Sequence, residues 1–292
     1  MPQGLPDAYP ADLLVLIEDY LAAADFGPDR RSAELVNAMR YSLLAGGKRI
    51  RPVLVLATTR SLGADPVTAL ATAAAFEFIH TYSLIHDDLP AIDNDTLRRG
   101  RPTCHVVYGE DIAILAGDGL FAEAFTLLVD KQPSPPDMVL ALIREIAHAT
   151  GVRGMVGGQY MDVVGRAAND EDLRLLHALK TGRLISSAVV CGALLGGAVD
   201  LAPYRAFAGE LGLLFQIVDD ILDEAGDEAE LGKSVGKDKA QDKTTYVSLY
   251  GLEQARELAD ASYARAVAHL HELPGHTDDL AAIATHIRRR TR

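Results

Sequence analysis

The chain has 292 residues, of which 49% are hydrophobic, 6% are aromatic and none is tryptophan. This supply of apolar residues is enough for a large core, and the prevalence of alanine and leucine favours helix over sheet. The formal net charge of −13 argues against non-specific nucleic-acid binding, because phosphate contacts need clustered cations.

The N-terminal segment and the cysteine content both favour a cytoplasmic location. Residues 1–10 contain three prolines, no basic start and no apolar core, so we expect a loose arm rather than a signal peptide. No run of 18 or more apolar residues is present, so no stable membrane association is expected. Cys104 and Cys191 are too few for a disulfide framework or a cysteine-based metal site.

Beyond the arm, apolar residues recur at helical spacing in segments that glycine or proline residues interrupt. The sequence predicts helices over 11–24, 32–45, 53–61, 65–88, 103–129, 138–149, 170–181, 184–195 and 201–222, with two or three more before the C-terminus. Four glycines within 151–158 indicate a break or kink, and no convincing strand pair is present. We therefore expect an all-α protein that forms one domain over residues 1–292.

Two clusters of aspartates each lie at the end of an apolar helical run. The first consists of Asp87, Asp88, Asp93 and Asp95, within nine residues and directly before two arginines. Proline disfavours helix at the residue before it, so Pro90 places Asp87 and Asp88 in the last helical turn. Asp93 is expected beyond the break.

The second cluster, Asp219, Asp220 and Asp223, lies on the helix predicted over 201–222. Asp219 and Asp223 are four residues apart and share one helix face. Carboxylates without neutralising neighbours repel one another, and hard cations such as Mg²⁺ take oxygen ligands, often together with substrate phosphate oxygens. One such cluster could be a solvated helix end, but two predict a single cavity that holds divalent metal ions.

Basic residues accompany both clusters. Arginine can bind phosphate through two hydrogen bonds, lysine supplies a point charge, and Gly46-Gly47 would let backbone N–H groups approach an anion. The candidate cations are Lys48, Arg49, Arg51, Arg98, Arg99, Arg101, Lys180, Lys233, Lys237 and Lys243. Each alone could be a solvated surface residue, but beside the acidic clusters they predict a site for two polyphosphate groups.

Several polar residues near the clusters fit either a structural or a functional role. They are His80, His86, Gln159, Asp162, Lys180 and Thr181. Each histidine could be a core residue or a carboxylate partner. The glycines before Gln159 could serve only helix packing, and Lys180-Thr181 could face either solvent or the cavity.

Together these motifs resemble those of the trans-isoprenyl diphosphate synthases. D-D-L-P-A-I-D and D-D-I-L-D match the two aspartate-rich motifs of that family. The other matching segments occur in the same order: G-G-K-R-I-R-P, H-T-Y-S-L-I-H-D-D, L-R-R-G-R-P-T, G-G-Q-Y-M-D, K-T-G, F-Q-I-V-D-D and L-G-K-S. The resemblance covers roughly residues 30–290, and L-I-H-D-D-L-P-A-I-D-N-D and P-T-C-H are most like the bacterial farnesyl diphosphate synthase branch.

The resemblance implies a multi-helix bundle around a deep central cavity, usually assembled as a homodimer. It implies several Mg²⁺ ions per site, replaceable by Mn²⁺, that bridge the allylic diphosphate to Asp87, Asp88, Asp93, Asp219 and Asp223. Further contacts to that diphosphate would come from Arg98, Lys180, Lys233 and Lys243, and the oxygens near the allylic cation from Thr181 and Gln216. Isopentenyl diphosphate would be bound by Gly47, Lys48, Arg51, His80 and Arg99.

The implied activity is prenyl transfer. Isopentenyl diphosphate would be joined head-to-tail to dimethylallyl or geranyl diphosphate through a Mg²⁺-assisted allylic carbocation, giving (E,E)-farnesyl diphosphate and diphosphate. The departing diphosphate can accept the proton, so no side-chain base is required. Water must be excluded from such a cation. The charged, glycine-containing segment 223–242 lacks apolar periodicity and is therefore expected to act as a lid.

Product length in this family is controlled near the fifth residue before the first aspartate-rich motif, which is Tyr82 here, with Ser83 next to it. An aromatic floor implies a C15 product. The nearest rival is a C20 geranylgeranyl diphosphate synthase, which shares every motif. A non-catalytic partner subunit of a synthase is the alternative from another class, although it would be expected to have lost an acidic motif. A class I terpene cyclase would not need the G-G-K-R-x-R segment.

Overall fold

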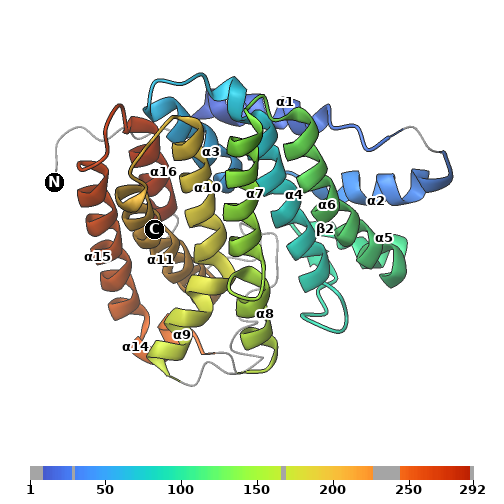
Figure 1. Ribbon diagram of the computed structural model, residues 1–292. Coiled ribbons are helices and arrows are strands. Elements are labelled where there is room, and N and C mark those ends of the chain that lie inside the picture. The colour runs from blue at the N-terminus through green and yellow to red at the C-terminus, as the bar shows by residue number, and fades with distance from the viewer. Residues whose placement is uncertain (1–8, 28–29, 166–168, 226–243, 290–292) are drawn as a thin grey trace.

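Figure 1 shows a computed structural model of the protein, which describes residues 9–27, 30–165, 169–225 and 244–289. Nearly all regular structure in these ranges is helical, which confirms the predicted all-α class. The helices are α1 Ala11–Ala22, α2 Ala33–Leu43, α3 Ile50–Ser61, α4 Leu70–Asp87, α5 Cys104–Tyr108, α6 Glu110–Lys131, α7 Pro136–Thr150, α8 Met155–Val163, α9 Asp170–His177, α10 Arg183–Leu195, α11 Ala202–Ala225, α14 Tyr246–Tyr250, α15 Leu252–Leu270 and α16 Asp278–Arg289. The short elements are η1 Arg30–Ser32, η2 Pro66–Ala69, the π-helical segment η3 Ala178–Gly182, and the antiparallel strands β1 Leu97–Arg98 and β2 Arg101–Pro102.

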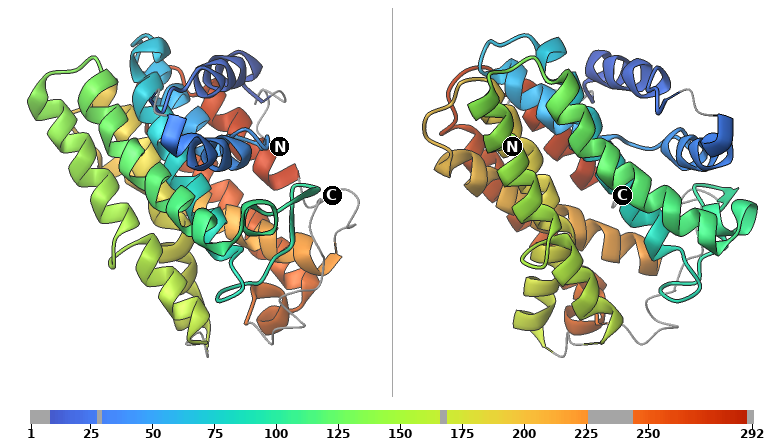
Figure 2. Two further views of the ribbon diagram at one scale, coloured as in Figure 1. Left: turned by 90° about the vertical axis from the view of Figure 1, so that its right-hand side faces the viewer. Right: turned by 45° about the vertical axis from the view of Figure 1, so that its right-hand side comes forward.

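The long helices run in roughly the same direction through the molecule, with α15 at one side and α6 towards the other (Figure 1). Helix α3 is buried along nearly its whole length and contacts α4, α10 and α16. Helices α1 and α2 pack on the outside of these long helices (Figure 2). One cluster of buried hydrophobic residues extends from Leu13 in α1 to Ile287 in α16, so the first and last helices share a core.

The close approach of α10 to α3 depends on Gly192. A Cβ atom at this position would lie 2.5 Å from the carbonyl oxygen of Val55, so a larger residue would require the helices to move. The hydroxyl of Thr59 donates a hydrogen bond of 3.2 Å to the Gly192 carbonyl oxygen across the same contact. This contact fixes α10 and, with it, the η3 segment that directly precedes it.

Two helix boundaries differ from the prediction for local reasons. The helix predicted over 103–129 is interrupted at Gly109, whose φ of 90° ends α5 before α6 begins. Helix α3 begins at Ile50 rather than at residue 53. Pro52 is compatible with this start, because the first turn of a helix does not need its N–H.

Three further features were not predicted. The helices expected over 170–181 and 184–195 form one continuous run, because η3 joins α9 to α10. The strands β1 and β2 form a short pair. The predicted lid over 223–242 begins in helix, since α11 continues to Ala225; the rest of that segment lies outside the described residues.

Two helical stretches are long and apolar enough to cross a membrane by length and composition, which corrects the expectation that none exists. They are α6 and the continuous run Asp170–Leu195, whose most apolar windows are 33% and 50% buried. Both pack against other helices, α6 on α4 and α10 on α3 and α11. Core helices of a bundle meet the same criterion, so this is weak evidence for a membrane segment.

Candidate active site

A cavity of about 730 Å³, here called the main cavity, lies between α4, α8, η3 and α11. Residues before α3 and in the β1–β2 hairpin complete its wall. The sequence-predicted site residues that line it are Gly47, Lys48, Arg51, His80, Tyr82, Ser83, Asp87, Arg98, Arg99, Lys180, Thr181 and Asp219. Those that do not line it are Asp88, Asp93, Gln216 and Asp223. Lys233 and Lys243 lie outside the described residues.

The first acidic cluster folds back on itself at the end of α4. The helix ends at Asp87, because Pro90 prevents it from continuing. The chain then reverses, and the backbone N–H of Asp93 donates to the carbonyl oxygen of Asp87 over 2.9 Å. The N–H of Asp95 donates to the carbonyl oxygen of Asp88 over 3.1 Å. The predicted break is confirmed, and it returns Asp93 to the neighbourhood of Asp87.

Asp87 lines the main cavity in surroundings that disfavour its negative charge. Its pKa is raised to about 6, chiefly by burial and further by the carboxylates of Asp93 and Asp88, while Lys180 opposes the rise. A divalent cation at this position would relieve both the burial cost and the repulsion. Asp87 therefore has the environment expected of a metal ligand.

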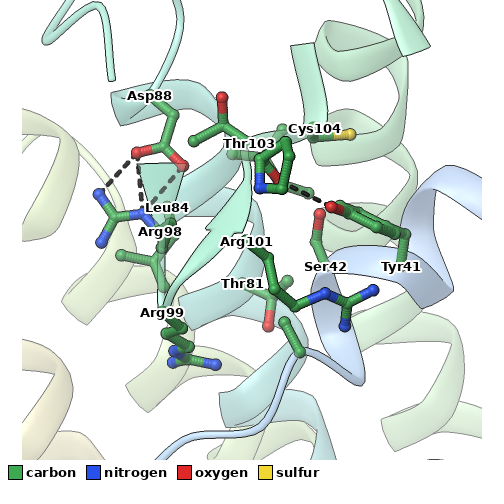
Figure 3. Close-up of a pocket in the computed structure, with 13 residues that line it drawn as sticks. Tyr41, Ser42, Thr81, Leu84, Asp88, Arg98, Arg99, Arg101, Thr103 and Cys104 are labelled. Carbon is green, nitrogen blue, oxygen red and sulfur yellow. Dashed lines mark hydrogen bonds and ion pairs between the residues drawn. The ribbon is translucent and has the colours of Figure 1, made fainter. Parts of the chain in front are cut away.

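Asp88 follows Asp87 directly but binds a different partner. Figure 3 shows its carboxylate held by the guanidinium of Arg98, with Nε 2.8 Å from both carboxylate oxygens and Nη2 2.6 Å from Oδ1. Asp88 is only 3% exposed. Arg98 also lines the main cavity, so Asp88 orients a cation there. In the predicted role of metal ligand, Asp88 would have to exchange Arg98 for the ion.

The β1–β2 hairpin brings Arg99 against the glycine pair before α3. Arg99 and Gly100 adopt left-handed φ values of 53° and 72° in the tight connection. A Cβ atom at Gly47 would lie 2.7 Å from the Arg99 guanidinium carbon, and Arg99 donates a hydrogen bond to the carbonyl oxygen of Gly46. The glycine pair thus permits the close approach of an arginine to this wall of the cavity.

Arg51 is a buried cation that faces the main cavity. Its Nε has no hydrogen-bond partner among the described residues, and burial lowers its pKa. Its guanidinium carbon lies 6.0 Å from the centre of the Phe215 ring. Burial, and then the positive charges of Arg51 and Arg99, hold the pKa of His80 well below 6.5, so this histidine is neutral. An incompletely paired buried guanidinium beside a neutral histidine is a natural anion site.

Two of the candidate cations, Arg49 in the wall of the main cavity and Arg101 outside it, are held by other side chains. Arg49 forms ion pairs with Glu77 at 2.5 Å and Glu18 at 2.7 Å, and its side chain is fully buried. The guanidinium of Arg101 lies 4.5 Å from the centre of the Tyr41 ring, beside the smaller cavity shown in Figure 3. These contacts favour a structural role for both arginines.

The second acidic cluster divides its aspartates between two sides of α11. Asp219 lines the main cavity. Asp220 is 4% exposed and accepts hydrogen bonds from the Gln216 side-chain amide at 2.9 Å and from the backbone N–H of Tyr246 at 2.8 Å. Asp223 is also buried. Asp220 therefore joins α11 to the start of α14 and fixes Gln216.

The η3 segment turns Lys180 and Thr181 towards the main cavity, which resolves the alternative left open by the sequence. Lys180 Nζ lies 2.5 Å from an oxygen of Asp162, and the Thr181 hydroxyl donates to Gln216 Oε1 over 3.2 Å. A Cβ atom at Gly158 would lie 2.2 Å from the Lys180 backbone nitrogen. The G-G-Q-Y-M-D segment thus serves both packing and charge pairing.

The sequence left the role of Gln159 open and gave no indication of Phe121. Gln159 lines the main cavity, and both polar atoms of its side-chain amide are buried without a hydrogen-bond partner among the described residues. Phe121 in α6 packs edge-on against Tyr82, with ring centres 5.0 Å apart, and Phe125 continues the contact at 5.2 Å. Its position in the cavity wall favours a functional role for Gln159, whereas no local signal in the sequence indicates Phe121.

The donor set of the main cavity fits Mg²⁺. Among the described residues, no group of three or more histidine, cysteine, aspartate or glutamate side chains could hold a metal ion by itself. Mg²⁺ is commonly bound by one or two carboxylates together with substrate phosphates, so such a group is not required. The raised pKa of Asp87 and the buried carboxylates around it are the observation that supports the fit.

Comparison with known proteins agrees with this geometry. The family model described as polyprenyl synthetase matches residues 32–280. A Geobacillus stearothermophilus farnesyl diphosphate synthase is 50% identical over 232 residues, covering 77% of this chain and 78% of that protein. A chloroplastic geranylgeranyl pyrophosphate synthase from Capsicum annuum is 51% identical over 228 residues. That match covers 76% of this chain and 62% of the pepper protein, which is less than two thirds of its length.

Solved structures show the same fold. An FPP/GFPP synthase from Zymomonas mobilis superposes with a TM-score of 0.85 at 38% identity, covering 95% of this chain and 96% of that one. A Helicobacter pylori geranyltransferase, solved with magnesium and isoprenyl diphosphate, gives 0.84 at 32% identity, with 96% and 94% covered. By the extent of the family match and the identity to these relatives, the chain belongs to the polyprenyl synthetase family of prenyltransferases.

Proposed function

We propose that this protein condenses isopentenyl diphosphate with dimethylallyl and geranyl diphosphate and releases (E,E)-farnesyl diphosphate. The observation that carries the proposal is the composition of one cavity. Its wall combines the carboxylates of Asp87 and Asp219, the guanidinium groups of Arg51 and Arg99, and an aromatic cluster that begins at Tyr82.

The acidic part of the cavity suits the allylic diphosphate. When bound, Mg²⁺ would neutralise the leaving group as a Lewis acid, held by phosphate oxygens and by Asp87, Asp93, Asp219 and Asp223. Lys180, positioned by Asp162, would add a point charge to that group, and Arg98, positioned by Asp88, would donate hydrogen bonds to it.

The cationic part suits isopentenyl diphosphate. Arg51 and Arg99 would hold its diphosphate, with the neutral His80 as a hydrogen-bonding neighbour. Thr181 and Gln216, which share a hydrogen bond, would turn oxygens towards the developing allylic cation. The allylic carbon–oxygen bond breaks and the new carbon–carbon bond forms. The released diphosphate would then accept the proton that the isopentenyl unit loses.

The aromatic cluster of Tyr82, Phe121 and Phe125 supports a C15 product. A chain that lengthens along the cavity would meet the Tyr82 ring, which Phe121 supports from behind. Burial raises the pKa of Tyr82 to about 12, so the phenol stays neutral at working pH. A C20 product is the second candidate, favoured by the 51% identity to the geranylgeranyl pyrophosphate synthase of pepper.

A product assay tests this proposal. Purified protein, Mg²⁺ and isopentenyl diphosphate would be combined with dimethylallyl, geranyl or farnesyl diphosphate, and the dephosphorylated products sized. We expect C15 products and no extension of farnesyl diphosphate. Chains of C20 would replace the C15 assignment, and no condensation with any primer would favour a non-catalytic partner subunit.

Variants of the aromatic cluster sharpen the assay. Tyr82→Ala and Phe121→Ala should each lengthen the product, because each removes a ring from the end of the cavity. Tyr82→Phe retains the ring and is the matched control, with C15 expected. Unchanged product length in both alanine variants would reject the aromatic floor while leaving prenyl transfer intact.

A further inference from the structure

A third cavity, here called the rear cavity, lies between the η3–α10 junction and α11. Its volume is about 250 Å³, against about 730 Å³ for the main cavity. Three arginines line it, Arg174, Arg183 and Arg205, together with His177. No carboxylate lines it within the part of the chain that the structure describes. A concave surface lined by several guanidinium groups is suited to a compact anion.

The charges around the rear cavity are only partly balanced. Arg174 is paired with Asp170 at 2.8 Å, and Arg205 is paired with Glu145 through two contacts of 2.9 and 2.7 Å. The side chain of Arg183 is exposed and makes no hydrogen bond or ion pair with any residue that the structure describes. Three guanidinium groups against two carboxylates leave one positive charge, located at Arg183.

His177 adds a polar side chain to the wall of the rear cavity. Its ring Nδ1 is buried and has no hydrogen-bond partner among the described residues. Its ring lies 5.4 Å from that of Tyr246. Burial lowers the pKa of His177 to about 3, so the ring is neutral and can act as a hydrogen-bond donor or acceptor. A buried polar atom without a partner marks a place for a ligand or an ordered water.

The rear cavity shares a wall with the main cavity. Ala178 and Gly182 of η3 line the rear cavity, whereas Lys180 and Thr181 of the same segment line the main cavity. Helix α11 is in close contact with η3, because a Cβ atom at Gly212 would lie 3.0 Å from the Gly182 Cα. A ligand bound between these elements would touch the back of the segment that carries Lys180.

We propose that the rear cavity is a second anion site, which binds a compact diphosphate-bearing molecule through Arg183, with Arg174, Arg205 and His177 around it. A diphosphate offers several acceptor oxygens to the guanidinium groups, and arginine favours such contacts. The ligand bridges the η3–α10 junction to α11 and thereby stabilises η3 from the side opposite to the proposed active site.

The test is hydrogen–deuterium exchange with inorganic diphosphate, measured in EDTA so that no divalent metal contributes and no turnover is involved. The backbone amides of residues 178–186 should exchange more slowly as diphosphate is added, because a bridging ligand suppresses local opening. Arg183→Gln should raise the diphosphate concentration needed for half-protection by about tenfold, the effect of losing a charge-assisted hydrogen bond.

A second variant blocks the rear cavity without removing charge. Gly209 lines it, and a Cβ atom there would meet no atom within 4 Å, so Gly209→Leu should fold and fill the space. It should weaken protection as Arg183→Gln does. Arg256→Gln, at an exposed arginine of α15 that lines neither cavity, and Lys48→Ala, which alters the main cavity, should leave it unchanged.

Three outcomes would overturn the proposal. One is no slowing of exchange in the unaltered protein. Another is half-protection in Arg183→Gln and Gly209→Leu at the same concentration as in Arg256→Gln. The third is a loss of protection in Lys48→Ala, which would place the diphosphate in the main cavity. None of these outcomes depends on whether the protein condenses prenyl diphosphates.

Discussion

The two acidic clusters use a similar arrangement of aspartates to different structural ends. In each, the first aspartate, Asp87 or Asp219, lines the main cavity. The second aspartate is bonded to other groups of the protein. Asp88 forms an ion pair with Arg98, and Asp220 accepts hydrogen bonds from Gln216 and from the start of α14. An aspartate pair in sequence is therefore one cavity-facing carboxylate and one positioning carboxylate.

The two clusters also differ in how the third aspartate is placed near the first. After Asp87 the helix is broken at Pro90, and a reversed loop returns Asp93 through a backbone hydrogen bond. After Asp219 the helix continues, and Asp223 shares its face by helical periodicity alone. The first arrangement depends on the backbone hydrogen bonds of a loop, whereas the second depends on the periodicity of one helix.

The largest expected effect comes from the cavity-facing aspartate of the rigid cluster. Asp219→Asn should lower kcat/KM for prenyl transfer by about 10³-fold, because it removes charge from the proposed metal site. Its free energy of unfolding should change little. Steady-state kinetics with geranyl diphosphate would measure this. A loss of kcat/KM below tenfold would show that lining the main cavity does not identify the aspartate that activity requires.

Substitution of Asp220, the other aspartate of the pair, should lower the free energy of unfolding. Asp220→Ala leaves the buried N–H of Tyr246 without its acceptor and releases Gln216, so we expect a loss of about 2–3 kcal/mol. Urea unfolding measures this value, with Asp219→Ala as the matched control in the neighbouring position. Equal destabilisation by both substitutions would contradict the division of roles.

In the metal-free protein, ionisation of Asp87 should lower the free energy of unfolding as pH rises. Because its pKa is raised from 3.8 to about 6, the folded state holds this proton more tightly than the unfolded chain does. The resulting stabilisation is complete below about pH 4 and is lost as pH rises through about 6. Asp87→Asn cannot ionise and should therefore be more stable than the unaltered protein by about 2 kcal/mol at pH 8.

Unfolding of Asp87→Asn and of the unaltered protein would be followed in urea with EDTA at pH 4 and pH 8. The difference should nearly vanish at pH 4, where Asp87 is neutral in the folded protein. If the difference in free energy of unfolding were the same at both pH values, ionisation of Asp87 would not destabilise the folded protein.

The smallest effect is expected for the positioning aspartate of the first cluster. Asp88→Asn should weaken the hold on Arg98 and raise KM for the allylic diphosphate by about tenfold, the loss of one charge-assisted contact. Arg98→Gln should have a similar effect, and the double variant should be no worse than either alone. Additive losses would show that Asp88 acts independently of Arg98, as a direct metal ligand would.

The sequence by itself determined the helices and the positions of both acidic clusters along them. Apolar periodicity, Pro90 and the glycine pairs are local signals, so most of the predicted helices are present and the break after Asp88 is where it was expected. Errors arose where a local signal was weak, as at Gly109, or where a π-helical segment continued a helix that the sequence had divided.

Only the tertiary structure decided which partner each polar side chain has. Asp88 against Arg98, Lys180 against Asp162 and Asp220 against Tyr246 are contacts between residues 10 to 26 positions apart, and Phe121 reaches Tyr82 from another helix. The rear cavity likewise joins α9 and α10 to α11. Such contacts form when helices pack, and neither the spacing nor the chemistry of a single segment encodes them.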